Sequence, residues 1–318
     1  MTAIPFQPNL QEYSSPSVWE GIWVVDKPGG ITSNKVLQIL RKTTRLQRIG
    51  YLGTLDPIAT GVLPICIGWA TKIIPFLPNH PKGYRAEMIL GQKTDTQDRS
   101  GHVMETASCA LPGRSQVQEV LQEFIGSQEQ VPPSFSALKY KGKPLYQWAR
   151  RGIPIVKPPR QITIDSLRFL EMNGERVTFE LFCSPGTYVR TLCHDIGERL
   201  GCGAYLNQLQ RIQSGPFTLE QACPLEKIQR VTGVKEIEAL KIPLEKILEN
   251  FPHIQMDWKW KEVIKQGGSL AADWGDAPWP AIEPGKPIFL TGPRGELWAV
   301  YQKVGHPKQV FKPIRVII

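Results

Sequence analysis

Long apolar runs and paired cysteines are both missing from this sequence. No run approaches the roughly 18 apolar residues that a membrane-spanning helix needs. The first residues, "MTAIPFQPNLQEYSS", have no basic start followed by an apolar stretch, so no signal peptide is expected. The six cysteines contain no CxxC pair, which favours ordinary reduced thiols. We therefore expect a cytoplasmic protein without membrane contact.

Motifs for metal or nucleotide binding are also lacking. Cys183, Cys193, His194 and Cys202 lie close together in the sequence, but zinc ribbons use two short-spaced pairs and these spacings do not match. There is no Walker sequence, no HExxH and no GxSxG. The sequence thus predicts neither a metal nor another cofactor, and it argues against a hydrolase acting on a small anionic molecule.

Acidic residues are scarce between residues 27 and 86. The chain has 29 acidic residues, yet only Asp56 lies between Asp26 and Glu87. The net charge of +9 favours an anionic partner. The same interval holds nine basic residues: Lys27, Lys35, Arg41, Lys42, Arg45, Arg48, Lys72, Lys82 and Arg85.

Asp56 has two interpretations. Followed by Pro57, it could cap a helix, but Gly61 and Pro64 leave room for barely one turn. The alternative is a carboxylate presented on a tight loop whose glycines allow another backbone to come close. Because the surrounding bases favour the charged form, such a carboxylate would serve as a nucleophile or a base.

Arg190 falls in the first turn of a predicted helix, where the helix dipole disfavours a cation. A buried acidic partner such as Asp56 would resolve this conflict. A solvent-facing side chain, or a local pair with Asp195 or Glu198, is the alternative.

A second stretch without acids, residues 131–160, has seven basic residues interleaved with aromatic ones. It is either a solvated basic surface or a surface for phosphates and unstacked bases. Two such stretches in one chain favour nucleic acid. The predicted contacts with the RNA backbone are Lys139, Lys141, Lys143, Arg150 and Arg151.

Hydrophobic periodicity predicts a mixture of strands and helices without a regular βαβ repeat. The first half contains a strand at 21–26, a helix from Thr32 or Ser33 to about residue 46, and a strand at 82–91 followed by a polar loop. On the second strand Tyr84 shares one face with other apolar residues.

Further along, a helix at 115–126 is predicted to begin with a capping box of Ser115 and Gln118. A hairpin is predicted to turn at Asn173-Gly174, and another helix to end at Gly201. Near residue 251 the composition changes, with five of the nine tryptophans in the last 61 residues. We expect an α+β fold, with a mixed, mainly antiparallel sheet flanked by helices in residues 1–250 and a small β-rich domain in residues 251–318.

Five stretches resemble, in order, the motifs of the bacterial TruB family of tRNA pseudouridine synthases, which act on the T-loop uridine. They are "DKPGGITSN", "GTLDPIATGVLPICIGWATK", "KGYRAEMILGQKTDTQDRSG", "PSFSALKYKGKPLYQWARRG" and "CSPGTYVRTLCHDIGERLGCGAYLNQLQR". The match runs from about Gly21 to Phe217, and the tail is similar to a PUA-like RNA-binding domain.

The resemblance implies a pseudouridine synthase fold and isomerisation of the uridine at tRNA position 55 without a cofactor. It makes Asp56 the catalytic aspartate, Arg190 its ion-pair partner and Tyr84 the ring that packs against the flipped base. The implied partner is the tRNA T-arm, and the implied state is a monomer. The other substrate-binding residues are Tyr188, Leu209 and Lys27, of which Lys27 has a supporting role.

One position departs from the family pattern. The family has "G-H-x-G" before the aspartate, whereas this chain has Tyr51 in place of the histidine. Tyrosine keeps a flat ring but loses the imidazole, so we assign Tyr51 to substrate binding by stacking. A non-catalytic RNA chaperone that binds tRNA is the alternative function.

Overall fold

The computed structural model describes residues 16–231, 233–249, 251–271, 282–304 and 310–318. No helix within these ranges is long and apolar enough to cross a membrane. The N-terminal segment for which no signal peptide is expected lies outside them.

The large sheet of the described chain has 11 strands and is mixed and mainly antiparallel, as predicted. Parallel pairs occur where β1 meets β14 and where β3 meets β12. Its main path runs through β14 (Cys223–Pro224), β1 (Gly21–Lys27), β3 (Thr60–Ile67), β12 (Ala204–Ser214), β4 (Lys82–Leu90), β11 (Arg176–Cys183), β10 (Arg160–Asn173) and β7 (Gly126–Gln130). Off this path, β2 (Ile49–Tyr51), β13 (Phe217–Thr218) and β15 (Lys241–Ile242) pair with β3, β12 and β1.

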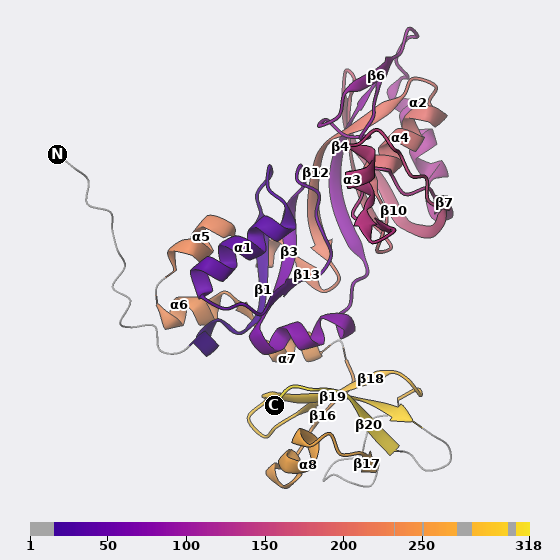
Figure 1. The fold of residues 1–318 in the computed structure, drawn as a ribbon. Helices are drawn as coiled ribbons and strands as arrows, with labels where there is room; N and C mark the ends of the chain where they lie inside the picture. The colour runs from indigo at the N-terminus through magenta and orange to yellow at the C-terminus, as the bar shows by residue number, and fades with distance from the viewer. Residues whose placement is uncertain (1–15, 232, 250, 272–281, 305–309) are drawn as a thin grey trace, which may run out of the picture.

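Helices lie along this sheet in two groups (Figure 1). Near β1 are α1 (Ser33–Thr44), α5 (Leu225–Arg230), α6 (Val234–Ala239), α7 (Leu244–Leu248) and two 3-10 segments, η2 (Pro16–Trp19) and η3 (Gly68–Phe76). At the other end are α2 (Arg114–Glu123) and α4 (Val189–Arg199), which contact each other. A short 3-10 turn, η4 (Leu219–Gln221), follows β13.

Helix α1 begins where the sequence predicts. The Thr32 side chain accepts a hydrogen bond from Lys35 N at 3.1 Å, and the helix ends at Arg45 in the left-handed conformation. Its apolar positions, Val36, Leu37 and Leu40, are buried in the core.

Helix α2 is also present, but the predicted capping box is wrong. The helix begins at Arg114 with Gly113 as its N-cap, and no side chain caps it. Ser115 therefore already has helical backbone, so its hydroxyl is two positions past the N-cap and too late to satisfy the free N–H groups of the first turn.

The β10–β11 hairpin forms with its turn one residue later than predicted. Asn173 still pairs with Arg176, so the loop is Gly174-Glu175. Gly174 has φ +60°, which glycine adopts more readily than other residues.

A smaller sheet of five strands follows, as predicted for the C-terminal region. It consists of β16 (His253–Gln255), β18 (Pro287–Thr291), β19 (Leu297–Val304), β20 (Val310–Val316) and β17 (Leu270–Ala271), with η5 (Trp258–Trp260) and α8 (Lys261–Lys265) beside it. Phe289 and Val300 of this sheet share a hydrophobic cluster with Ile22 of β1. The division of the chain at residue 250 stays a prediction.

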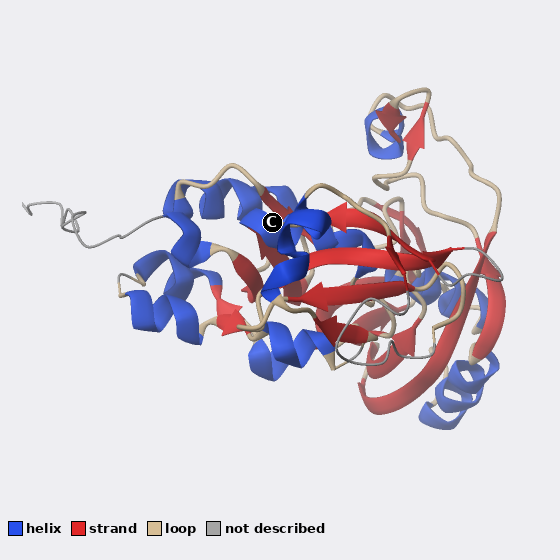
Figure 2. Cartoon of the chain, turned by 90° about the horizontal axis from the view of Figure 1, so that it is seen from below, coloured by secondary structure: helices blue, strands red, loops and turns tan. Residues whose placement is uncertain are grey.

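Two small hairpins extend from the large sheet. The first pairs β5 (Gln92–Thr94) with β6 (Val103–Thr106); β5 lies in the segment predicted as a polar loop, and β6 follows that segment. The second, β8 (Lys139–Tyr140) with β9 (Lys143–Pro144), leads into the short helix α3 (Leu145–Ala149). Figure 2 shows this second unit standing away from the sheet on two long loops.

Candidate active site

The loop that carries Asp56 connects β2 to β3 and is held by the start of helix α1. Ser33 Oγ donates to Leu55 O at 3.1 Å and accepts from Leu55 N at 2.9 Å. Gly30 N donates to Pro57 O at 2.8 Å. Because both neighbours of Asp56 are bonded to the turn and helix after β1, its backbone position is fixed.

Lys27 also supports this loop through hydrogen bonds to its backbone. Its side chain is fully buried, and Nζ donates to Pro28 O at 2.9 Å, Ala59 O at 2.6 Å and Pro57 O at 3.4 Å. Burial lowers the pKa of Lys27 to about 8, although Asp56 opposes this shift. These contacts suit the supporting role implied for Lys27.

Arg211 of β12 holds the other side of the loop. Its buried guanidinium donates through Nε to Val62 O at 2.6 Å and through Nη2 to Gly53 O at 3.0 Å. The strands come so close here that a Cβ on Gly61, whose φ is +93°, would lie 2.2 Å from Arg211 O. Glycine is therefore required where β3 enters this contact.

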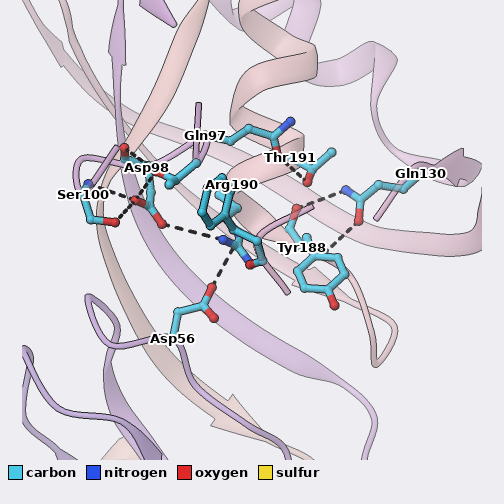
Figure 3. A network of polar contacts seen from close by, with 10 residues as sticks. Asp56, Gln97, Asp98, Ser100, Gln130, Tyr188, Arg190 and Thr191 are labelled. Atoms are coloured by element: carbon cyan, nitrogen blue, oxygen red, sulfur yellow. Dashed lines mark hydrogen bonds and ion pairs between the residues drawn. The ribbon is translucent and has the colours of Figure 1, made fainter. Parts of the chain in front are cut away.

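Arg190 and Asp56 form an ion pair, with 3.5 Å between Nε and Oδ2 (Figure 3). The Arg190 side chain is 5% exposed, whereas that of Asp56 is 38% exposed. Arg190 Nη2 also donates to Phe135 O at 2.7 Å. The predicted pair thus places a partly accessible carboxylate against a buried guanidinium in the first turn of α4.

A second carboxylate, Asp98, lies beside another nitrogen of this guanidinium. Its Oδ2 is 3.9 Å from Arg190 Nη1, and its side chain is 6% exposed. Oδ1 of Asp98 accepts hydrogen bonds from Thr96 Oγ1 at 2.8 Å and from both the backbone and the hydroxyl of Ser100. Asp98 was not predicted from the sequence, although it lies in one of the quoted motifs.

A cavity of about 310 Å³ opens beside the Asp56–Arg190 pair. Tyr84, Tyr188 and Leu209 line it together with that pair, as the sequence predicts for residues of one site. Burial raises the pKa of the Tyr84 hydroxyl, although the nearby Arg211 opposes the shift. The cavity thus combines one carboxylate with aromatic and apolar surface of a size suited to a nucleobase.

Lys82 also lines this cavity and was not singled out from the sequence. It is 4% exposed, and Nζ donates to Ser214 Oγ at 2.7 Å. Burial lowers the pKa of Lys82 to about 7, and Arg211 adds to the effect. The sequence contains a signal for this position. Lys82 lies two residues before Tyr84 on β4, and residues two apart on a strand point to the same face.

Tyr51 and Lys27 do not line the cavity. Tyr51 ends β2, where it pairs with Ile65, and its half-buried ring packs against the main core. The stacking role of Tyr51 stays a prediction.

The predicted RNA-backbone residues gather on the β8–β9–α3 unit and the residues directly after it, and all five are exposed. Aromatic rings position several of them: Lys141 Nζ lies 5.5 Å from the Tyr140 ring centre, and Arg150 lies 5.5 Å from that of Tyr146. The unit therefore presents cations beside aromatic rings, a combination suited to nucleic acid.

The cysteines and histidine considered for zinc do not form a cluster. In the part of the chain that the structure describes, no three His, Cys, Asp or Glu side chains are grouped to hold a metal ion.

Solved structures share this fold. A chain in "Crystal Structure of a Cbf5-Nop10-Gar1 Complex" is 25% identical, with a TM-score of 0.72 over 98% of this chain and 91% of that chain. A chain in "Structure of H/ACA RNP bound to a substrate RNA containing 2'-deoxyuridine" is 24% identical, with a TM-score of 0.71 over 95% of this chain and 86% of that chain. The fold class is that of the pseudouridine synthases.

Sequence comparisons give the family. The model described as "TruB family pseudouridylate synthase (N terminal domain)" matches residues 41–189, and "tRNA pseudouridylate synthase B C-terminal domain" matches residues 190–249. The "tRNA pseudouridine synthase B" of Syntrophotalea carbinolica is 41% identical over 87% of this chain and 90% of its own length. That of Geobacillus thermodenitrificans is 38% identical over 93% and 99%. This chain belongs to the TruB family of pseudouridylate synthases.

Proposed function

We propose that this protein isomerises uridine to pseudouridine in tRNA, and that its target is the T-loop uridine at position 55. The observation that carries the proposal is the Asp56–Arg190 ion pair at the wall of a cavity that Tyr84 also lines. The name of the curated relatives, tRNA pseudouridine synthase B, supports the same reaction.

In the proposed reaction the target uridine leaves its stack and enters the cavity, at a cost of a few kcal/mol. The Asp56 carboxylate then acts on the nucleotide, and the bond between C1′ and N1 breaks. The base turns, a bond forms between C1′ and C5, the C5 proton passes to solvent, and N1 takes up a proton in its place. No atom is gained or lost apart from this proton exchange, so the product is an isomer of the substrate.

The surrounding residues have distinct parts in this proposal. Arg190 holds the carboxylate in position, while Lys27 and Arg211 hold the backbone that carries it. Tyr84 packs against the base, and Tyr188 and Leu209 limit the space in which the base turns. Such fixed positioning lowers the barrier because little reorganisation remains at the moment of reaction.

The proposed RNA partner is the T-arm, contacted by Lys139, Lys141, Lys143, Arg150 and Arg151. We also propose that the protein acts as a monomer in the cytoplasm. Sedimentation of the protein alone and with one equivalent of tRNA measures the stoichiometry directly.

Tritium release from tRNA labelled at uridine C5 tests the reaction, and mapping of pseudouridine in the product tests the position. We expect one modified uridine, in the T-loop, and no release by the Asp56→Asn variant, which keeps its tRNA affinity because phosphate contacts supply most of it. Binding without tritium release by the wild-type protein would instead support the RNA chaperone. Release by the Asn variant would remove Asp56 from the mechanism.

A further inference from the structure

The cavity beside Asp56 has more positive charge than its carboxylate can balance. Four basic side chains line it, namely Lys82, Arg160, Arg190 and Arg211, against the single acid Asp56. Arg190 is paired with Asp56, while Arg211 and Lys82 donate to protein oxygens. Arg160 is the member of the four whose guanidinium forms neither an ion pair nor a hydrogen bond with the described residues.

Two nitrogen atoms of Arg160 are buried without a hydrogen-bond partner. These are Nε and Nη2 of its guanidinium, and Arg160 forms no ion pair with any of the described residues. A buried donor without an acceptor costs about 1–3 kcal/mol, and more when it is charged. Such an arrangement is expected where a ligand supplies the acceptor.

The guanidinium is nevertheless held in a defined place. It stacks on the Tyr188 ring at 4.6 Å from the ring centre, and Arg190 lies 5.5 Å from the same centre. A Cβ on Gly186, which has φ +91°, would lie 3.3 Å from Arg160 Nη1, so the glycine leaves room for the arginine.

The backbone around Arg160 is tied to the same wall of the cavity. Arg160 pairs with Gln130 of β7 at the start of β10. The Gln130 amide bonds both backbone atoms of Tyr188, accepting from N at 2.8 Å and donating to O at 3.0 Å. Arg160 and Tyr188 are therefore positioned by one set of contacts.

We propose that Arg160 binds a phosphate that flanks the target uridine once that nucleotide has entered the cavity. The neutral uracil base would leave the charge of Arg160 unbalanced, whereas a phosphate supplies both the charge and two oxygens for the planar fork. This contact also offsets part of the cost of extruding the nucleotide. The proposal rests on the proposed function, because it takes the RNA nucleotide as the ligand of the cavity.

The test is a double-mutant cycle in which one change is made in the protein and the other in the RNA. T-arm stem–loops carry one neutral methylphosphonate at the linkage 5′ or 3′ to the target uridine. The sugar before that linkage is 2′-deoxy in the modified and the control RNA, because a neighbouring hydroxyl would cleave the neutral linkage. Dissociation constants are measured for wild type, Arg160→Gln and the control Arg168→Gln, which changes an exposed arginine on the same strand.

We expect Arg160→Gln to weaken binding of the unmodified stem–loop about tenfold or more, as for a lost hydrogen bond to a charged group. One of the two neutral linkages should weaken wild type by a similar factor and Arg160→Gln hardly at all. Arg168→Gln should respond to the linkages as wild type does. Thermal melting of each variant shows whether it is folded.

Two outcomes overturn the proposal. If Arg160→Gln binds like wild type, Arg160 contacts no part of the RNA. If it binds weakly but both neutral linkages still weaken it as they weaken wild type, its partner is not a flanking phosphate. The tritium-release assay tests the proposed function separately. Absence of release by the wild-type protein on labelled tRNA would contradict that function, whatever the binding results.

Discussion

Nη1 of Arg190 lies 3.9 Å from Oδ2 of Asp98, while Nε of the same guanidinium contacts Asp56 (Figure 3). One planar cation thus joins a nearly inaccessible carboxylate to the partly exposed one. Asp98 is itself fixed by Thr96 and Ser100, so the position of Asp56 depends on a chain of contacts that extends into the β5–β6 hairpin. A paired buried charge also avoids the large cost that an isolated one would have.

Replacing Arg190 with lysine should reduce turnover severely. A lysine ammonium is a point charge and cannot contact Asp56, Asp98 and the Phe135 carbonyl in the geometry of a planar fork. Single-turnover rates measure this effect, and Arg199→Lys, near the exposed end of the same helix, is the control. A near-normal rate for Arg190→Lys would mean that Arg190 does not position Asp56.

Changing the five exposed basic residues on and after the β8–β9–α3 unit to glutamine should weaken tRNA binding and flatten its salt dependence. Each lost phosphate contact should reduce the slope of log K against log salt by about 0.7 to 0.9. Turnover at saturating tRNA should change much less, because these side chains lie outside the cavity. The residues are Lys139, Lys141, Lys143, Arg150 and Arg151.

The control for this experiment changes exposed bases on α5 and α6, namely Lys227, Arg230 and Lys235. An unaltered slope for the variant with the five substitutions would show that these basic residues form an ordinary solvated surface without phosphate contacts. An equal reduction by the control would mean that the effect is not specific to the β8–β9–α3 unit.

Tyr51→Phe should be nearly silent, whereas Tyr51→Ala should lose about tenfold in kcat/KM, equivalent to roughly 1.4 kcal/mol. The physical reason is stacking, since an aromatic ring beside an extruded base recovers about 1–3 kcal/mol. The ring also packs against the core, so melting temperatures must accompany the kinetics. A loss of stability with unchanged kcat/KM would reduce Tyr51 to a packing residue, and a Phe variant as poor as Ala would show that the hydroxyl is needed.

The buried Lys82 predicts a pH dependence of stability. Its pKa is about 7 in the folded protein against an ordinary value of 10.5. Between these pH values the unfolded chain holds more protons, so the contribution of Lys82 to the free energy of unfolding rises with pH. Below pH 7 both states are protonated and the contribution is constant.

Urea unfolding at several pH values compares wild type with Lys82→Met. The stability of the Met variant relative to wild type should decline as pH rises above about 7, because only wild type gains from deprotonation. Lys139→Met, at an exposed position on β8, provides the baseline. A difference between wild type and Lys82→Met that is independent of pH would contradict the assignment.

Sequence patterns predicted elements well where periodicity was strong. Helix α1 and strand β4 follow directly from apolar spacing and the Thr32 cap. The β5–β6 hairpin could not be found this way, because its residues are polar or exposed and show no alternation between a core and a solvent face. The Ser115 box failed because a capping pattern does not determine on which residue a helix begins.

The site, like the fold, was predicted only in part. The scarcity of acids drew attention to Asp56, but counting charges along the chain does not show which bases are buried, as Lys27 and Lys82 are. Asp98 stood among other polar residues, and only the three-dimensional contacts distinguish it from its exposed neighbour Asp95. Long-range pairing of this kind leaves no local signal in the chain.

The close approach of Gly61 to Arg211 limits how this site can be re-engineered. Any side chain at position 61 would collide with the backbone of β12, and an insertion nearby would break the register that Arg211 shares with Gly61. A library aimed at altered base preference should therefore keep residues 53–61 constant and randomise a different segment of the lining, around Pro185 and Thr187. There, substitutions change the shape of the cavity without displacing the loop on which Asp56 lies.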